Sequence, residues 1–380
     1  MSAPDQTSRL KTEAARLGFA LSGVCKAAAP PGIDRFREWI SRGYAGEMTY
    51  LADRADAYAD PGRVLDGVDS ILMLGMPYSL QPALPAERGQ GRVSRYAWSD
   101  VDYHDVIHDR LQELCGFLRR EAPEAVCRGV VDTAPLLERE FAQLAGLGWI
   151  GKNSLLLSRD FGSYFFLAAV LTDLPLAADA PFPSNHCGAC RACLDACPTN
   201  AFVEPYVLDA SRCISYLTIE LRGPIPHDLR PMMGDWIFGC DVCQEVCPWT
   251  SHATDHSAEA FAPSPDRNPI DANELLMLSE TEFRARFRKT PLWRAKRRGV
   301  LRNAAIALGN RPCAEAIKPL ACGLADDEPL VRGACAWALA RQRDTLASTA
   351  LQERLAVETD AVVRAEIQRA LEHAQAGGEA

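Results

Sequence analysis

The 380-residue sequence predicts an α+β multidomain protein with an α/β domain, a cysteine-rich domain and an α-helical repeat tail. Three observations predict this class. Short apolar segments alternate with amphipathic ones up to about residue 175, and eight of the fourteen cysteines lie between residues 187 and 247. An Ala-Leu pattern then recurs at offsets of 31 and 32 residues, which is typical of HEAT-like helical repeats. The expected domains are 1–175, 176–255, 256–298 (a linker and basic segment) and 299–375.

Local signals place the elements of the first domain. An amphipathic pattern that ends at Gly18 predicts the first helix. Pro135 is well suited to the first turn of the third helix. Short apolar runs between turn signals predict the strands. The expected helices cover 6–17, 102–120 and 135–145, and the expected strands cover 70–76, 127–132 and 164–172.

The cysteine spacing predicts two iron–sulfur clusters. One run reads Cys187-x2-Cys190-x2-Cys193-x3-Cys197-Pro198, which is the bacterial ferredoxin pattern, in which the fourth cysteine ligates the other cluster. A second run and one outlying cysteine complete a set of eight. The expected ligands are Cys187, Cys190, Cys193 and Cys247 for one [4Fe–4S] cluster, and Cys197, Cys213, Cys240 and Cys243 for the other.

Two other uses of these cysteines remain open at this point. Structural zinc takes four ligands, usually as two separated pairs, and does not explain the triple run or the two Cys-Pro endings. Disulfides require export, for which the N-terminus shows no signal. The six scattered cysteines are expected to be small buried hydrophobes: Cys25, Cys115, Cys127, Cys313, Cys322 and Cys335.

Charge is concentrated in the basic segment, defined here as residues 284–302. The chain carries a net charge of −9, yet nine cations and no acid lie in this segment. Such a strip predicts a polyanionic partner, and a solvated helix face is the alternative. The absence of a signal-like or membrane-spanning run leads us to expect a cytoplasmic protein.

Asp132 stands at the end of an expected strand, where α/β proteins often place chemistry. It is either a proton donor with a raised pKa or the N-cap of the following helix. Residues 95–98 and 102–104 form a polar-aromatic cluster that is either packing or part of a site. The residues alone do not decide between these uses.

Motifs spread over nearly the whole chain resemble the epoxyqueuosine reductases, which complete queuosine synthesis in bacterial tRNA. Both cysteine runs belong to this pattern. The other segments that carry it are Ser94-Arg95-Tyr96-Ala97-Trp98, Asp102-Tyr103-His104-Asp105, Val131-Asp132-Thr133-Ala134-Pro135, 145–149, Lys152-Asn153, Phe161-Gly162-Ser163-Tyr164, 213–218, 290–298 and 302–304.

The resemblance implies a fold, cofactors and a substrate. The first domain would be nitroreductase-like and would hold base-off cobalamin, as in the related reductive dehalogenases. Two [4Fe–4S] clusters would feed it electrons from a donor such as a flavodoxin or ferredoxin. The substrate would be epoxyqueuosine at the wobble position of a tRNA anticodon, and the enzyme, an oxidoreductase, would act as a monomer.

The resemblance also implies roles for single residues. Asp132 would deliver a proton to the leaving epoxide oxygen. The residues expected around the cobalamin are Arg54, Tyr96, Asp132, Lys152, Asn153, Gly162 and Ser163. The residues expected to bind tRNA are Arg294, Lys296, Arg297, Arg298 and Arg302, of which the first, third and fourth would share a helix face.

Two rival functions stay open. A ferredoxin-type electron carrier with a docking tail has no need of the large first domain. A cobalamin-dependent reductive dehalogenase has no need of a basic surface for tRNA, and such enzymes are usually exported. Binding of both cobalamin and tRNA by one protein would exclude both rivals.

Overall fold

The structure is a computed structural model that describes residues 3–183, 186–253 and 259–376. Its contacts divide the chain into two compact units. The first comprises 1–81, 101–211 and 241–262, and the second comprises 82–100, 212–240 and 263–380. The expected boundaries at 175 and 255 do not appear in this division, because strand pairing draws two distant segments into the second unit.

The first unit is built on a four-stranded antiparallel sheet in the order β1-β2-β7-β4. The central strand β2 is buried along its whole length, which explains its continuous apolar sequence. It pairs with β7 from Ser70 opposite Thr172 to Pro77 opposite Phe165. The strands are β1 (Leu21–Lys26), β2 (Ser70–Pro77), β4 (Cys127–Val130) and β7 (Phe165–Thr172).

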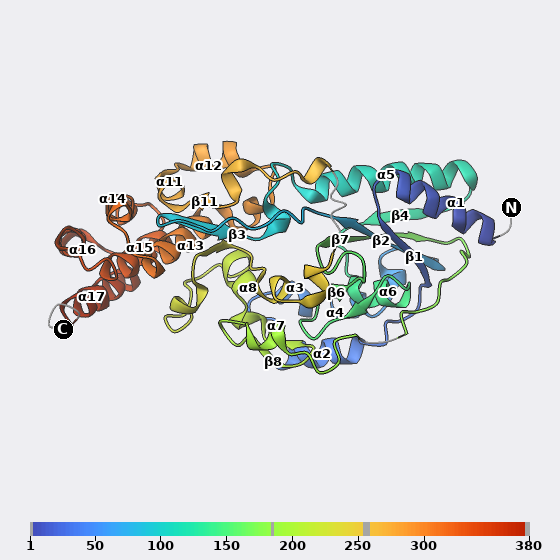
Figure 1. Ribbon diagram of the computed structural model, residues 1–380, viewed down its shortest axis with the longest axis horizontal. Coiled ribbons are helices and arrows are strands. Elements are labelled where there is room, and N and C mark those ends of the chain that lie inside the picture. The colour runs from blue at the N-terminus through green and yellow to red at the C-terminus, as the bar shows by residue number, and fades with distance from the viewer. Residues whose placement is uncertain (1–2, 184–185, 254–258, 377–380) are drawn as a thin grey trace. The chain divides into compact units, whose positions relative to one another are not determined.

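Helices cover both faces of this sheet. In Figure 1, α1 (Ala3–Arg16) and α5 (Tyr103–Glu121) lie on one face, and α6 (Glu138–Leu144) lies on the other. Five side chains of α5 are buried, and Asp102 caps its N-terminus. Smaller elements of the unit are α2 (Ile33–Ser41), α3 (Thr49–Asp53), α4 (Ala55–Tyr58), β5 (Trp149–Ile150), β6 (Leu156–Leu157), α7 (Ala192–Asp195), β8 (Phe202–Glu204), β9 (Val207–Leu208), α9 (Val242–Glu245) and α10 (Pro248–Ser251).

One helix was predicted with the wrong first residue. The helix expected from Pro135 begins three residues later, at Glu138, and its N-cap is Leu137, which makes no side-chain capping bond. Asp132 therefore does not cap it. The preceding strand also ends at Val130, which places Asp132 on the loop between strand and helix. The capping interpretation of this carboxylate is thereby excluded.

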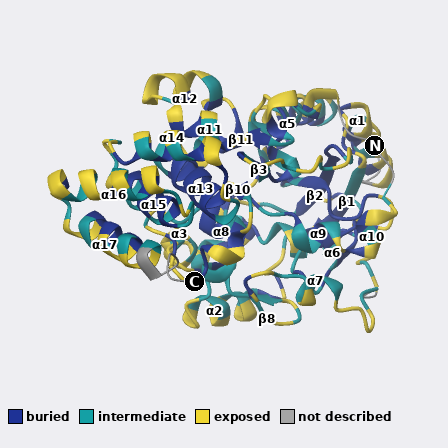
Figure 2. Ribbon diagram, turned by 60° about the vertical axis from the view of Figure 1, so that its left-hand side comes forward, coloured by how far each residue is buried: buried dark blue, intermediate teal, exposed yellow. Residues whose placement is uncertain are grey.

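The second unit combines a small sheet with a helical tail. β3 (Gln90–Val93) pairs in parallel with β10 (Trp236–Phe238) and antiparallel with β11 (Ile270–Asp271). Its helices are α8 (Ile214–Ile219), α11 (Ala272–Met277), α12 (Glu280–Phe287), α13 (Lys296–Asn310), α14 (Ala314–Gly323), α15 (Pro329–Ala340), α16 (Thr345–Val357) and α17 (Ala361–Ala376). Because α13 is buried throughout residues 299–309, it forms the core of this unit (Figure 2).

The three repeated sequence segments fall on α13, α15 and α17, which pack one against the next. The helices α14 and α16 alternate with them along the chain (Figure 1). The period predicted from the Ala-Leu pattern is thus the period of stacked helical hairpins, since small residues allow the inner helices to approach closely. This confirms the predicted repeat tail.

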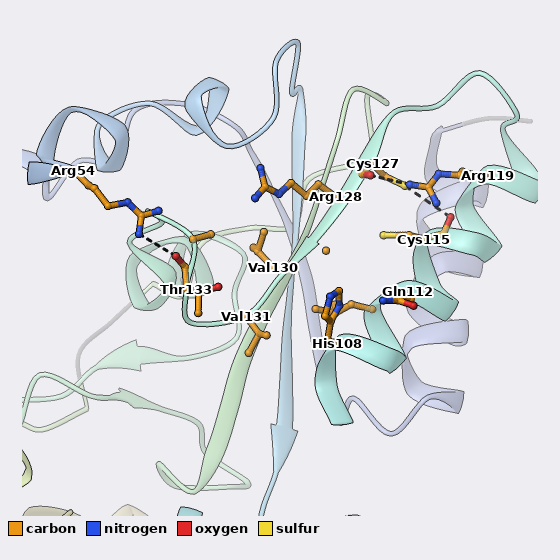
Figure 3. A pocket seen from close by; sticks show the side chains of 13 residues that line it. Arg54, His108, Gln112, Cys115, Arg119, Cys127, Arg128, Val130, Val131 and Thr133 are labelled. Atoms are coloured by element: carbon orange, nitrogen blue, oxygen red, sulfur yellow. Dashed lines mark hydrogen bonds between the residues drawn. The ribbon is translucent and has the colours of Figure 1, made fainter. Parts of the chain in front are cut away.

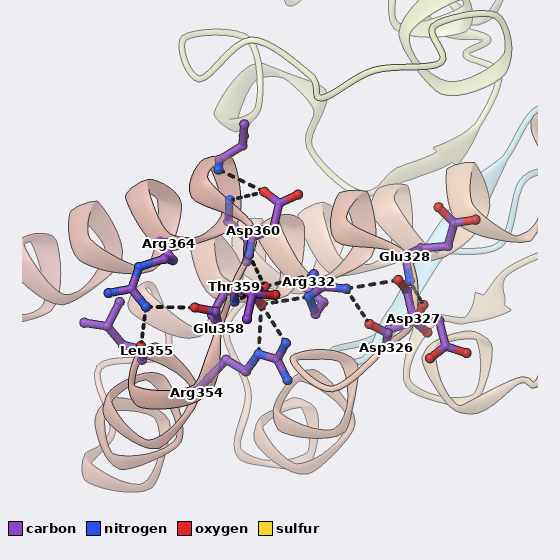
Figure 4. Close-up of polar contacts among 12 residues, drawn as sticks. Asp326, Asp327, Glu328, Arg332, Arg354, Leu355, Glu358, Thr359, Asp360 and Arg364 are labelled. Carbon is purple, nitrogen blue, oxygen red and sulfur yellow. Dashed lines mark hydrogen bonds and ion pairs between the residues drawn. The ribbon is translucent and has the colours of Figure 1, made fainter.

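The buried carboxylate of Glu358 connects the last helices of the repeat tail through hydrogen bonds. Glu358 follows α16 and accepts hydrogen bonds from Arg332 at 2.8 Å, from Arg354 at 2.7 Å and from the backbone of Asp360 at 2.9 Å (Figure 4). These interactions, led by the bonds from Arg332 and opposed by burial, lower the pKa of Glu358 to about 2. The ionised form is therefore favoured in the folded protein.

Replacement of Glu358 by glutamine is expected to destabilise the tail by roughly 3 kcal/mol, because two arginines lose a buried partner. Hydrogen exchange in α15, α16 and α17 measures this loss. The stabilisation is present above the unfolded pKa of about 4.5 and is lost as the pH falls toward 2, so the variant should be less sensitive to acid. Exposed Glu353 on α16 gives the control, Glu353→Gln, which should leave exchange unchanged.

Candidate active site and metal centre

Asp132 lies on the loop that leaves the edge strand β4. Its backbone is left-handed, with φ of 56°, a conformation that aspartate and asparagine tolerate better than most residues. Its side chain is 55 % exposed and accepts hydrogen bonds at Oδ2 from the Tyr103 hydroxyl at 3.0 Å and from His104 Nε2 at 3.2 Å. The loop thus presents a carboxylate that α5 holds in place.

His104 links Asp132 to a second carboxylate. Its Nδ1 lies 2.7 Å from Oδ1 of Asp102, so the imidazole bridges two acids. Burial favours the neutral ring, but the hydrogen bonds to Asp102 and Asp132 and their charges raise the pKa of His104 to about 9. The imidazole therefore carries a proton at neutral pH, next to the carboxylate of Asp132.

Glu138 completes this group from the other side of the loop. Its Oε1 accepts a hydrogen bond from the backbone N–H of Asp132 at 2.9 Å. Desolvation and the negative charge of Asp132 raise the pKa of Glu138 to about 8. Four ionisable groups, from α5, the loop and α6, thus meet at the end of β4, which is the arrangement expected of proton-transfer chemistry.

The sequence did not predict the roles of His104 and Glu138. Residues 102–104 were left open between packing and a site, and the structure places Tyr103 and His104 in hydrogen-bond contact with Asp132. The available signal was their spacing, because an aspartate that caps a helix places residue 104 in its first turn. Nothing in the sequence marked Glu138, whose position depends on where α6 begins.

A cavity of about 710 Å³ opens beside the same strand. Figure 3 shows α5 on one side of it and the loop after β4 on the other. The Arg54 side chain reaches the carbonyl of Thr133 at 3.1 Å, and Arg119 and Arg128 add two more cations. The rest of the lining is His108, Leu111, Gln112, Cys115, Cys127, Gly129, Val130, Val131 and Ala134. A large ligand with apolar and anionic parts would suit this lining.

A further cavity is lined by all four of the cysteines that are predicted to hold the first cluster. Cys187, Cys190, Cys193 and Cys247 share it with Lys152. Burial and the nearby thiols of the other three raise the pKa of Cys193 to about 11, which reflects how closely the four are grouped. Distant Cys247 thus lies around the same cavity as the first run, and the role of these four cysteines as cluster ligands stays a prediction.

The other cysteines form two groups, those assigned to the second cluster and the six scattered ones. Cys197, assigned to the second cluster, accepts a backbone N–H from Ala201 at 3.3 Å, a contact that stabilises a ligating thiolate. The second ligand set as a whole stays a prediction. Five of the six scattered cysteines are buried as expected, whereas Cys322 is exposed, which corrects the expectation for that residue.

Comparison with known proteins decides the family. Residues 186–250 match the model of a 4Fe-4S double cluster binding domain, 59–133 match "Epoxyqueuosine reductase QueG, DUF1730", and 292–372 match HEAT repeats. The epoxyqueuosine reductase of Pseudomonas aeruginosa is 42% identical over 334 residues, which are 87% of this chain and 92% of the relative.

The chain belongs to the epoxyqueuosine reductase family.

Solved members of the family share the fold at full length. An epoxyqueuosine reductase solved with an epoxyqueuosine-modified tRNA-Tyr stem loop has a TM-score of 0.91 and 30% identity, with 98% of this chain and 99% of that chain covered. The Bacillus subtilis enzyme, solved with a catalytic aspartate loop swung out of the active site, has a TM-score of 0.89 and 30% identity at 97% and 99% coverage. The double-cluster domain and the repeat tail are thereby confirmed.

Three of the residues that the family resemblance placed around cobalamin contact the cysteine-bearing segments. Lys152 donates to the carbonyls of Gly188 and Cys190 at 2.6 and 2.8 Å. Asn153 lies 3.4 Å from the carbonyl of Cys243, and the Ser163 hydroxyl donates to Gln244 at 2.9 Å. Through these contacts, Lys152, Asn153 and Ser163 hold the cysteine-bearing segments in place.

The other expected cofactor residues have separate surroundings. Gly162 has φ of 58°, and a Cβ there would lie 2.6 Å from the Cα of Thr250, so only glycine lets α10 approach. Tyr96 belongs to the second unit, where its ring centroid lies 6.0 Å from that of Phe238. Contacts of Arg54, Gly162 and Tyr96 with cobalamin stay predictions.

The structure corrects part of the RNA surface that the resemblance to epoxyqueuosine reductases suggested. Arg302 is 1% exposed and donates to the carbonyls of Leu217, Leu221 and Gly223. Its guanidinium supports the fold, so its expected role in tRNA binding was wrong. The continuous apolar sequence around it indicates why, since α13 is the core helix.

Arg297 and Arg294 also differ from expectation. Arg297 pairs with Asp326 through both terminal nitrogens, so it is an internal ion pair. Arg294 lies on the 3-10 helix Pro291–Ala295 and pairs with Glu220 at 3.0 Å, whereas α13 begins at Lys296. The prediction that Arg294, Arg297 and Arg298 share a helix face was therefore wrong. The exposed or half-exposed cations of the basic segment with no carboxylate partner among the described residues are Arg284, Arg288, Lys289, Lys296 and Arg298.

No helix in residues 3–183, 186–253 or 259–376 is both long and apolar enough to cross a membrane.

Proposed function

We propose that this protein reduces epoxyqueuosine in the anticodon of tRNA to queuosine, with cobalamin and two [4Fe–4S] clusters. The observation that carries the proposal is the full-length match to a relative solved with an epoxyqueuosine-modified tRNA stem loop. The net reaction takes up two electrons and two protons, removes the epoxide oxygen as water and leaves an alkene. A one-electron donor such as a flavodoxin or ferredoxin would supply the clusters.

The first unit fits cobalamin. The cavity beside β4 is large enough for the nucleotide tail of the cofactor, which is displaced in its base-off form. Leu111 and Val130 offer apolar contacts for an aromatic base, and Arg54, Arg119 and Arg128 offer partners for its phosphate. When bound, cobalamin supplies a strongly reducing centre that can attack an epoxide carbon.

Asp132 would supply a proton to the epoxide oxygen, because an alkoxide is a poor leaving group. Its exposed carboxylate accepts hydrogen bonds from Tyr103 and His104, which fix its position. A general acid in such a position contributes about 10²–10⁴ in rate. The B. subtilis relative is described with a catalytic aspartate loop, which supports an aspartate as the acid.

His104 would supply the proton that Asp132 delivers to the epoxide oxygen. Its imidazole carries a proton below a pKa of about 9 and lies 3.2 Å from Asp132, while Asp102 holds its other nitrogen. The protonated ring thus forms a reserve next to the acid. Asp102 is a positioning residue in this scheme, since it acts only through His104.

Incubation of the reconstituted protein with epoxyqueuosine-tRNA and a chemical reductant, followed by nucleoside mass analysis, tests the proposal. A product lighter by one oxygen atom is expected, and it should disappear when cobalamin is omitted. Unchanged nucleoside from protein that carries both clusters and cobalamin would contradict the proposed function.

The basic segment would bind the phosphates of the tRNA stem. We expect Lys289→Gln, Lys296→Gln and Arg298→Gln together to weaken tRNA binding by about 10-fold, because each cation can neutralise a phosphate. The slope of log K against log salt should become shallower by about two to three. Fluorescence binding assays over a range of salt concentrations measure both effects.

A matched control removes three exposed cations from the first unit: Arg9→Gln, Arg16→Gln and Lys26→Gln. This variant changes net charge equally and should keep the wild-type slope. Equal losses in both triple variants would show that overall charge, and no local surface, attracts the RNA.

A further inference from the structure

Lys152 stands at the turn of the hairpin formed by β5 and β6, against the first cysteine run. Its ammonium group donates to the carbonyl oxygens of Gly188 and Cys190 at 2.6 and 2.8 Å. Among the described residues, no carboxylate lies within ion-pair distance of it. Backbone carbonyls carry only partial charge, so the part of the chain that the structure describes leaves the positive charge of the ammonium largely uncompensated.

The same lysine lines the cavity that the thiols of Cys187, Cys190, Cys193 and Cys247 surround. A [4Fe–4S] cluster held there gains one negative charge when it is reduced. A fixed positive charge beside the cavity stabilises the reduced form more than the oxidised form, and the partly buried setting weakens solvent screening. Net charge near a cluster is one of the features that set its potential.

We propose that Lys152 raises the reduction potential of the cluster bound by these four cysteines and so sets it apart from the second cluster. The inference rests on the proposed ligand set but does not require tRNA or cobalamin. It assigns to Lys152 a role toward the cluster, which its contacts support. A lysine that only held the loop would need its hydrogen bonds, whereas this role needs its charge.

Two substitutions separate charge from hydrogen bonding. Lys152→Gln keeps donors for the two carbonyls but removes the charge, whereas Lys152→Arg keeps both. Lys26→Gln provides the control, because it removes an equal charge from an exposed lysine of the same unit that pairs with Asp69 at 2.7 Å. Iron content must first show that each protein carries about eight irons.

Redox titration of each full-length protein, followed by electron paramagnetic resonance, tests the proposal. In Lys152→Gln, the ratio of oxidised to reduced protein for one cluster should rise about 10-fold at a fixed ambient potential, which equals about 59 mV for one electron. The other cluster should titrate as in wild type. Lys152→Arg and Lys26→Gln should keep both wild-type ratios within about threefold.

Several outcomes would overturn this role. If Lys152→Gln titrates as wild type, or if both clusters shift equally, the charge does not act on one cluster. If the glutamine or arginine variant retains only four irons, Lys152 serves to hold the loop and the proposal fails. Failure of the turnover assay would bear on the proposed function alone, because this titration uses neither cobalamin nor RNA.

Discussion

Asp132→Asn is expected to lower turnover of epoxyqueuosine-tRNA by about 10²–10⁴ while the protein keeps its fold, clusters and cobalamin. Asparagine tolerates the left-handed backbone at this position, with its φ of 56°, and still accepts a hydrogen bond from Tyr103. It cannot supply a proton. Single-turnover measurements with nucleoside mass analysis check this expectation, and iron and cobalamin contents verify loading.

Exposed Asp105, on the first turn of α5, provides a control close to the site. Asp105→Asn should turn over at the wild-type rate. If Asp132→Asn also stays within about tenfold of wild type, the proton comes from another group.

The pH profile tests the part played by His104. Because its pKa is raised to about 9, the imidazole holds its proton below that pH and loses it above, so wild-type turnover should fall as the pH rises through about 9. His104→Gln should lack this limb and be slower at neutral pH. A wild-type profile in that variant would contradict the proton reserve.

Cysteine substitutions are expected to remove the clusters one at a time. Cys193→Ser should lower the iron content from about eight to about four per chain, because its thiol belongs to the predicted first ligand set. Cys213→Ser should have the same effect on the other set. Anaerobic iron analysis and electron paramagnetic resonance distinguish the two, since each variant should retain a different signal.

Cys335→Ala serves as the control, because this buried cysteine lies on α15 in the repeat tail. It should retain about eight irons. Loss of both clusters in each serine variant would mean that the cysteines do not divide as assigned. Zinc in place of iron would contradict the assignment altogether.

The sequence by itself determined those features whose signals are local. Ligand spacing identifies a double-cluster domain, because three thiolates separated by two residues can reach one cluster wherever the segment lies. Repetition of an Ala-Leu pattern identifies the helical tail for a similar reason, since each hairpin packs on its neighbour in the same way. The place of Asp132 shortly after a strand was also readable, together with the two roles open to it.

Only the tertiary structure excluded one of those roles, the cap of the following helix. Glu138 and His104 converge on Asp132 because α6 begins late and α5 packs against β4, neither of which is encoded near residue 132. The capping role depended on a helix start that the fold places elsewhere. Long-range packing thus places this carboxylate in a group of ionisable side chains, the proposed proton-transfer site.

The charged residues show most clearly that a role can depend on tertiary structure. In sequence, Arg297 and Arg302 are indistinguishable from their exposed neighbours, yet one pairs with Asp326 and the other satisfies three backbone carbonyls in the interior. Lys152 likewise turns toward the cysteine loop through contacts that span more than thirty residues. A charged side chain acquires its role from the partners that the fold brings to it, because burial and pairing decide whether it meets solvent, protein or ligand.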